Sequence, residues 1–181
     1  MIEDVLYSKE IISFPKNRSV YYYMVGKGEP LLFFHSVLGF QLKGFLAHLA
    51  KSYRVIAPFA PGWGPAKEQL EYFDEGPLDI TLHNSDFMEL MDLSSAHLVG
   101  VSIGAWMAAE LAAMFPQKVR SLILVNPVGI WRDEFGGEDL FAQHPGSPSK
   151  ILFANSETRE KVLFEGKDKL EAKVSEIMHL K

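Results

Sequence analysis

The sequence contains no cysteine, and this absence excludes several functions at once. A chain of 181 residues without cysteine cannot form a disulfide framework, a cysteine-ligated metal site or a thiol nucleophile. Its 18 basic and 23 acidic residues give a formal net charge of −5, so the composition offers no basic footprint for nucleic acid or for an anionic membrane. The sequence also lacks metal-ligand spacing and cofactor motifs, and we expect neither a metal nor a cofactor.

Long hydrophobic runs are absent as well. The longest apolar segment with helical character covers residues 104–115, far short of the ~20 residues that span a bilayer. The first ten residues are acidic at once and contain no apolar run, which is not typical of a secretory signal. With 48% hydrophobic and 23% charged residues, the composition is that of a globular domain. We therefore expect a soluble, cytoplasmic protein that does not bind a membrane.

Short apolar strands alternate with helical segments through the first 130 residues. Strands are predicted over residues 10–14, 19–25, 31–34, 54–57, 97–101 and 119–125, and helices over about 41–50, 80–91 and 103–115. Strands that are apolar on both faces and separated by helices predict an α/β fold, a mostly parallel sheet with helices on both faces. The two leading strands, joined by a short turn, predict an antiparallel edge. The segment Gly26-Lys27-Gly28 is interpreted as a hairpin turn.

The composition changes near residue 131. Residues 1–130 hold 23 charged residues and residues 131–181 hold 18, so charged positions are about twice as frequent in the shorter part. Four apolar residues of that part fall on one face of a predicted helix, with lysine and glutamate on the other face: Leu163, Leu170, Val174 and Ile177. We interpret residues 1–131 as the core domain and residues 132–181 as a helical lid segment.

The pattern Gly-x-Ser-x-Gly occurs at residues 100–104, between a predicted strand and an alanine-rich helix. A sharp strand-to-helix turn holds its central residue in a strained conformation, and the flanking Gly100 and Gly104 let the two elements approach closely. The hydroxyl of Ser102 is then expected at the helix N-terminus, where the dipole and free N–H groups favour developing negative charge. A tight turn with an incidental serine is the alternative, and we favour Ser102 as a nucleophile.

Several spaced motifs together resemble the α/β-hydrolase superfamily, in its branch with a serine nucleophile and a lid. Residues 26–40 resemble the third strand and oxyanion loop, residues 54–64 the loop after the fourth strand, residues 98–116 the nucleophile strand, elbow and helix, and residues 119–130 the next strand and its exit. The resemblance covers about residues 9–131 in the family's order. It implies the α/β-hydrolase fold.

The resemblance implies acyl transfer by Ser102, with the negative oxygen held by the backbone N–H groups of Val37 and Ile103. A serine at this position argues against the haloalkane dehalogenase and epoxide hydrolase branches, which use aspartate there. Two residues differ from the family pattern, because Ser36 replaces the usual glycine and Phe59 the usual aspartate. That aspartate orders its loop, so its loss concerns loop order more than chemistry.

The catalytic triad that the resemblance implies is not complete in this sequence. In the family the acid and the histidine follow the serine on later strands, and the last two strands are missing before Lys181. The acid and the histidine are therefore unassigned and expected beyond residue 181. His35 fits a role in loop structure, whereas His144 and His179 follow Ser102 and are kept as surrogate bases.

The other polar candidates receive structural interpretations. His48 lies on a predicted helix, His83 near a helix start and His97 at a strand start, so each is interpreted as structural or solvated. Asn126 ends the sixth strand, where some relatives place the acid, but an amide cannot stabilise an imidazolium as a carboxylate does. Trp63 could line a pocket, although packing is the commoner role of an aromatic residue beside a glycine-rich loop.

Hypotheses of two classes remain. The leading one is a serine hydrolase acting on a small-molecule carbonyl substrate, with a carboxylic ester as the default and the carbon–carbon bond of a ring-fission product as a further option. The alternative is a non-catalytic small-ligand-binding protein or an inactive fragment of a hydrolase. Because the strand over residues 119–125 is expected to leave an exposed apolar edge, we also expect a homodimer or pairing of another strand there.

Overall fold

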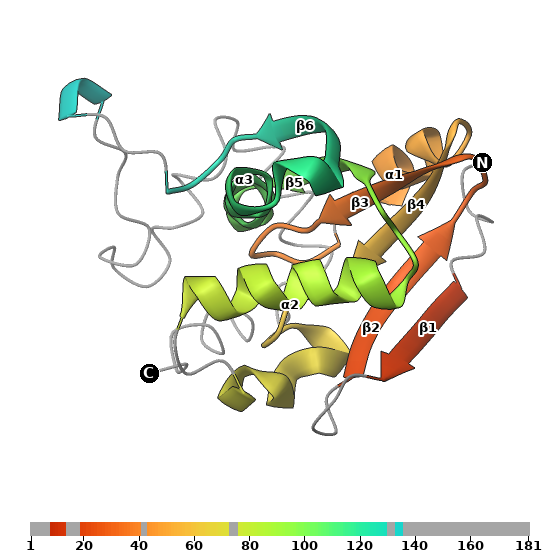
Figure 1. Cartoon of the computed structure of the whole chain (residues 1–181), viewed down its shortest axis with the longest axis horizontal. Helices are drawn as coiled ribbons and strands as arrows, with labels where there is room; N and C mark the ends of the chain where they lie inside the picture. The colour runs from red at the N-terminus through yellow and green to blue at the C-terminus, as the bar shows by residue number, and fades with distance from the viewer. Residues whose placement is uncertain (1–7, 14–18, 41–42, 73–75, 130–132, 136–181) are drawn as a thin grey trace, which may run out of the picture. The chain divides into compact units, whose positions relative to one another are not determined.

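The computed structural model describes residues 8–13, 19–40, 43–72, 76–129 and 133–135 (Figure 1). The strands are β1 (Ser8–Ser13), β2 (Ser19–Val25), β3 (Glu29–Phe34), β4 (Tyr53–Pro58), β5 (Ala96–Val101) and β6 (Val119–Val125). The α-helices are α1 (Lys43–Leu49), α2 (Pro77–Leu90) and α3 (Ile103–Met114), and the 3-10 helices are η2 (Gly64–Tyr72), η3 (Pro116–Lys118) and η4 (Asp133–Phe135).

The chain divides by its internal contacts into two units, Met1–Ile130 and Trp131–Lys181. All strands named above belong to the first unit. In the second unit only η4 is among the described residues, so the lid predicted over residues 132–181 lies almost wholly outside them and stays a prediction.

The six strands form one sheet in the order β1-β2-β4-β3-β5-β6. Strands β3, β4, β5 and β6 pair in parallel, and β1 and β2 are antiparallel, so the predicted mostly parallel sheet with an antiparallel edge is confirmed. Phe34 pairs with Gly100, and Val101 with Val125, so β3, β5 and β6 end together. We call this the C-terminal edge of the sheet and the opposite one the N-terminal edge.

The predicted hairpin turn at Gly26-Lys27-Gly28 is wrong. It connects β2 to β3, but these strands are not neighbours, because β4 lies between them. The turn instead crosses the junction between α1 and β4. A Cβ on Gly26 would lie 2.3 Å from the Tyr53 carbonyl oxygen, and the φ of Gly26 is +82°, so the crossing requires glycine.

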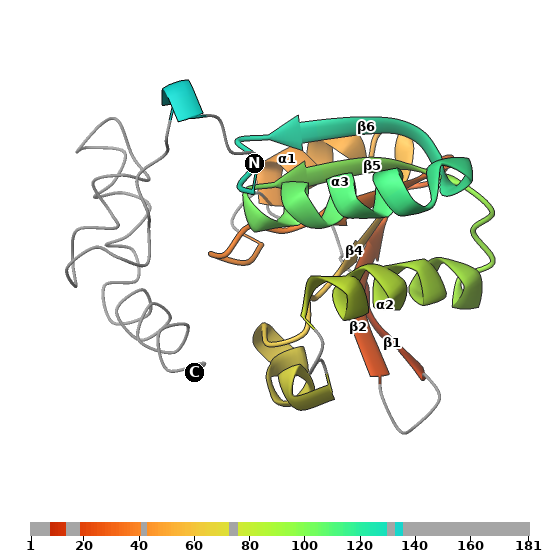
Figure 2. The same cartoon turned by 60° about the vertical axis from the view of Figure 1, so that its left-hand side comes forward.

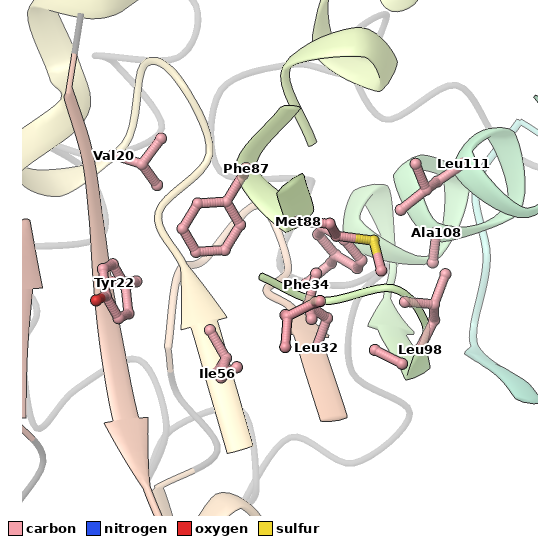
Figure 3. Packing of buried hydrophobic residues seen from close by; sticks show 12 residues of the cluster. Val20, Tyr22, Leu32, Phe34, Ile56, Phe87, Met88, Leu98, Ala108 and Leu111 are labelled. Carbon is pink, nitrogen blue, oxygen red and sulfur yellow. The ribbon is translucent and has the colours of Figure 1, made fainter. Parts of the chain in front are cut away.

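Alternate residues of β3 serve the two faces of the sheet. Leu32 and Phe34 pack toward α2 and α3, in a cluster that also holds Val20, Tyr22, Ile56, Phe87, Met88, Leu98, Ala108 and Leu111 (Figure 3). Leu31 and Phe33 pack on the other face, where α1 contributes Leu46. Figure 2 shows α2 and α3 on one side of the sheet, with α1 on the other. Each fully buried side chain of this kind contributes roughly 1.5–3 kcal/mol.

The helix over α2 begins three residues earlier than predicted. Pro77 occupies the first helical position, where its missing N–H costs nothing, and Gly76 precedes it with a φ of +85°. His83 therefore lies well inside α2 and is buried, rather than near a helix start. The 3-10 helix η2 was not among the predicted helices.

Candidate active site

Ser102 lies at the sharp turn between β5 and α3, at the C-terminal edge of the sheet (Figure 1). Its φ is +57° and its ψ is −118°. Such a backbone costs a non-glycine residue of order 1–3 kcal/mol, so the surrounding packing must hold it. The Ser102 N–H donates to the Val125 carbonyl oxygen over 2.9 Å, and the Ala105 N–H donates to the Ser102 carbonyl oxygen over 3.0 Å. Strand β6 and helix α3 thus hold the strained turn together.

Close contacts explain the two glycines that flank this turn. A Cβ on Gly104 would lie 2.3 Å from the Phe34 carbonyl oxygen, and a Cβ on Gly100 would lie 2.3 Å from the Gly104 carbonyl oxygen. Both contacts are with backbone atoms, which cannot move aside as a flexible side chain does. The first turn of α3 therefore lies directly against the end of β3.

The loop after β3 is held by His35, whose two ring nitrogens are both engaged. The buried ring places Nδ1 2.7 Å from the Ser36 carbonyl oxygen, and the Ala60 N–H donates to Nε2 over 3.0 Å. A carbonyl only accepts and an N–H only donates, so Nδ1 carries the proton and Nε2 the lone pair. His35 therefore connects the loops after β3 and β4 as a neutral imidazole. This bonding fits a role in loop structure and leaves no lone pair for a general base.

Two backbone N–H groups belong to the segments that meet at the first turn of α3. Within the described residues, neither the Val37 nor the Ile103 N–H donates a hydrogen bond. Ile103 opens α3, and the first N–H groups of a helix have no internal partner. Val37 lies three residues beyond Phe34, against which α3 packs. Both N–H groups thus belong to the C-terminal edge, and their roles as oxyanion donors stay predictions.

The exit of β6 forms a second strained turn against the first one. Asn126 is exposed and has a φ of +47°, and the Val128 N–H donates to the Ser102 carbonyl oxygen over 3.4 Å. A Cβ on Gly129, whose φ is +83°, would lie 2.8 Å from the Trp106 ring. The Trp106 indole therefore packs against the backbone that leaves β6.

No hydrogen bond joins Ser102 to a histidine within the part of the chain that the structure describes. His48 is exposed near the end of α1, and His97 is the second residue of β5, close to the N-terminal edge of the sheet. At ~3.3 Å per residue, the five steps along β5 from His97 to Ser102 span about 17 Å. Two candidate bases lie outside the described residues: His144 and His179.

A cluster that the sequence analysis missed lies at the N-terminal edge. Ser121 Oγ is 2.7 Å from His97 Nδ1, and His97 Nε2 is 3.1 Å from the Glu29 carboxylate. The Arg120 guanidinium donates to the other oxygen of that carboxylate over 2.6 Å. The hydrogen bond from His97, together with the charge of Arg120, lowers the pKa of Glu29. These side chains come from β3, β5 and β6, and only the register of the sheet brings them together.

In residues 8–129, apart from the gaps given above, and in 133–135, no group of three or more histidine, aspartate or glutamate side chains could hold a metal ion. Among the helices of the same residues, none combines the length and the apolar content that crossing a bilayer requires.

A family model described as the α/β hydrolase fold matches residues 29–165, well over half of the chain. The chain belongs to the α/β-hydrolase fold family. This α/β hydrolase is 36% identical over 107 residues to the dihydrolipoyllysine-residue acetyltransferase component of the acetoin cleaving system of Cupriavidus necator. The match covers 58% of the chain and 28% of that protein. It is 30% identical over 105 residues to the 2-hydroxy-6-oxo-6-phenylhexa-2,4-dienoate hydrolase of Burkholderia cepacia, covering 58% of the chain and 34% of that protein.

Solved structures give the same fold. A bacterial membrane phospholipase A superposes on the α/β hydrolase with a TM-score of 0.70 at 20% identity, over 94% of this chain and 60% of that chain. At this identity the likeness concerns the fold alone. The chain spans about a third or less of the length of the two curated relatives named above.

The α/β hydrolase makes local contacts at the two positions that differ from the family pattern. Ser36 Oγ accepts a hydrogen bond from the Leu38 N–H over 3.2 Å. The Phe59 ring packs against the rings of Tyr23 and Phe40, with centroids 5.1 and 4.8 Å apart. Ring packing therefore holds the beginning of the loop after β4, where the family pattern has an aspartate.

Proposed function

We propose that this α/β hydrolase acts on a carbonyl substrate with Ser102 as its nucleophile. The observation that carries the proposal is the positive φ of Ser102, +57°, at the C-terminal edge of a parallel sheet. Backbone strain of this size is concentrated at functional sites. In open α/β sheets ligands bind outside the carboxyl ends of the strands, which is where Ser102 lies.

In the proposed reaction, Ser102 Oγ attacks the carbonyl carbon and its proton passes to a base. The tetrahedral intermediate then collapses to an acyl-enzyme as the leaving group departs with that proton, and water hydrolyses the acyl-enzyme. The N–H groups of Val37 and Ile103 hold the negative oxygen of the tetrahedral intermediates, and the N-terminus of α3 favours the same charge. Gly100 and Gly104 allow the close packing that sets these groups side by side. The base and its acid stay unassigned: the family's order puts them beyond residue 181, and His144 and His179 are the surrogate bases within the chain.

Carboxylic esters are the substrate class that we propose first. The names of the relatives include an acetyltransferase component and a dienoate hydrolase, and reactions of these kinds share attack on a carbonyl carbon. The dienoate hydrolase supports the carbon–carbon bond of a ring-fission product as the second substrate class. Turnover of p-nitrophenyl esters against turnover of a vinylogous 1,5-diketone distinguishes the two classes.

A binding protein without catalysis is the second candidate function. It is favoured by one observation: within the described residues, no histidine is hydrogen-bonded to Ser102, and both ring nitrogens of His35 are engaged elsewhere. In that case the fold keeps the nucleophile's position without its chemistry. Reversible binding of a small apolar carbonyl compound without turnover would distinguish this function from hydrolysis.

Labelling with a fluorophosphonate probe tests the proposal, because the probe reacts with serines that a base and an oxyanion hole activate. The labelled residue is located by mass spectrometry in the wild-type chain, in Ser102→Ala and in Ser121→Ala. We expect labelling of Ser102 that persists in Ser121→Ala and disappears in Ser102→Ala, with His144, His179 or a partner chain supplying the base to this chain. No labelling of a folded sample would favour the binding protein. Labelling of Ser121 alone would contradict the proposed site.

A further inference from the structure

The peptide group between Ser36 and Val37 is held at its carbonyl end. The Ser36 carbonyl oxygen accepts the His35 Nδ1–H over 2.7 Å and the Gly39 N–H over 2.9 Å. In a trans peptide the N–H and the C=O point in opposite directions. The two donors on the carbonyl therefore direct the Val37 N–H away from themselves.

The next peptide group, between Val37 and Leu38, is held at both ends. Its carbonyl oxygen accepts the Trp63 Nε1–H over 2.9 Å, and its N–H donates to Ser36 Oγ over 3.2 Å. The orientation of a residue is defined by its two flanking peptide planes, because φ and ψ are its soft dihedral angles. The two planes share the Val37 Cα, so holding the second plane restricts how far the first one, which carries the Val37 N–H, can rotate.

The backbone around Trp63 is itself anchored. The Trp63 N–H donates to the Ala60 carbonyl oxygen over 3.0 Å, and the Ala66 N–H donates to the Trp63 carbonyl oxygen over 2.9 Å. The indole lies edge-on to the His35 ring, with centroids 5.7 Å apart. The loop after β4 therefore donates twice to the loop after β3, from Ala60 to His35 and from Trp63 to Val37.

We propose that Trp63 is a positioning residue for the oxyanion hole, acting through the Val37 carbonyl. Its indole N–H holds one of the two peptide planes that orient the Val37 N–H toward the substrate oxygen. The proposal rests on the proposed function for its catalytic consequence, but its structural claim stands by itself. A packing role requires only the ring, whereas the positioning role requires the indole N–H.

Nuclear magnetic resonance tests the structural claim without any activity. We compare the wild-type chain with Trp63→Phe and with a chain that carries benzothienylalanine at position 63, an isostere with the indole shape but no N–H. In both chains we expect the Val37 carbonyl carbon resonance to move and the residual dipolar coupling of the Val37 N–H to change. Ser121→Ala, which removes a hydrogen bond at the opposite edge of the sheet, should leave both unchanged.

The rate of fluorophosphonate labelling at Ser102 tests the catalytic consequence. Loosening one oxyanion donor should lower the maximal labelling rate by about tenfold or more, with the concentration of probe at half-maximal rate little changed. The isostere keeps the packing, so a loss of folding in Trp63→Phe does not obscure the result.

The outcomes separate the two proposals. An unchanged Val37 N–H coupling in the isostere overturns the positioning role, whether or not Ser102 is labelled. A changed coupling with an unchanged labelling rate also overturns it, because the orientation would then not matter to the reaction. A wild-type chain that is not labelled contradicts the proposed function, and the positioning of Val37 is then decided by the coupling alone.

Discussion

The two edges of the sheet each hold a serine, and the two serines differ in what surrounds them. At the N-terminal edge, Ser121 contacts His97, which contacts Glu29, in the connectivity of a catalytic triad. At the C-terminal edge, Ser102 has a positive φ and precedes a helix, but no histidine is bonded to it within the described residues. The triad-like hydrogen bonds and the nucleophile-like backbone thus lie at opposite edges of the same sheet.

This difference teaches that serine, histidine and acid in contact are not sufficient evidence of catalysis. Ser121 lies within β6, without a positive φ and without a long helix beginning beside it. The Glu29 carboxylate is mostly exposed, so water screens its ion pairs. The N-terminal cluster therefore ties β3, β5 and β6 together, whereas the C-terminal edge holds the strained backbone of Ser102.

The largest loss of stability is expected from a side chain placed where the first turn of α3 packs against the end of β3. In Gly104→Ala the new Cβ meets the Phe34 carbonyl oxygen at 2.3 Å, and we expect a loss of about 3 kcal/mol or more in the free energy of unfolding. Gly44→Ala on α1 is the control, because nothing lies within 4 Å of its Cβ. Urea denaturation measures both, and equal midpoints would show that the turn is not held by this contact.

The next largest difference in stability is expected between substitutions of His35 and of His97. His35→Ala removes a buried ring, leaves the half-buried Ala60 N–H without its acceptor and takes one of two donors from the Ser36 carbonyl oxygen, so we expect a loss of about 2–4 kcal/mol. His97→Ala removes half-exposed contacts, and we expect about 1 kcal/mol or less. A larger loss in His97→Ala, measured by urea denaturation, would reverse the comparison of the two edges.

Strand β6, at one end of the strand order, should mediate association of the protein with another strand. It has a partner strand on one side only among the described residues, and Leu122 and Ile123 are 38% and 53% exposed. We propose that a second copy or another strand pairs there, because an apolar strand edge is a template for pairing. Sedimentation velocity should show concentration-dependent association that weakens in Ile123→Lys.

Strand β1, at the other end of the strand order, offers a matched control for this association. Ile11 on β1 is 58% exposed, so Ile11→Lys makes the same chemical change at the opposite end of the sheet. We expect Ile11→Lys to associate as the wild type does. A wild-type chain that stays a stable monomer at high concentration would contradict pairing through β6.

The smallest effect is expected at Glu29. Because folding lowers its pKa, the stability that it contributes is present above its unfolded pKa and is lost as the pH falls through the lower folded value. The stability difference between wild type and Glu29→Gln should therefore be present at pH 7 and disappear in acid. Denaturation at several pH values measures it, with Glu68→Gln on η2 as the control. A constant difference would show that the charge of Glu29 is not involved.

Most strands were predictable because each is a short run of apolar residues bounded by turns. The Ser102 turn was also predictable in position, since the contact that requires Gly100 lies between β5 and the helix that follows it. The contact of Gly104 with the distant β3 was not predictable. The strand order was not predictable, because β2 pairs with β4 and not with β3. Local sequence specifies a strand, but its partner depends on long-range register.

The side-chain contacts between distant segments could not be predicted for the same reason. Trp63 and Val37 are 26 positions apart, and His97 and Glu29 are 68 apart. Each pair meets only after the sheet has formed. The aromatic packing of Phe59, which replaces the expected aspartate, likewise depends on rings from two other segments.

The position of β4 between β2 and β3 affects how the chain can fold while it is being synthesised. Both neighbours of β3 in the sheet, β4 and β5, follow it in the chain, whereas β1 and β2 can pair as soon as they are made. The apolar residues of β3, Leu31 to Phe34, therefore leave the ribosome before any strand that can cover their backbone groups. An unpaired apolar strand is prone to aggregate. A central strand of the finished sheet is thus the one that most needs protection while the chain is growing.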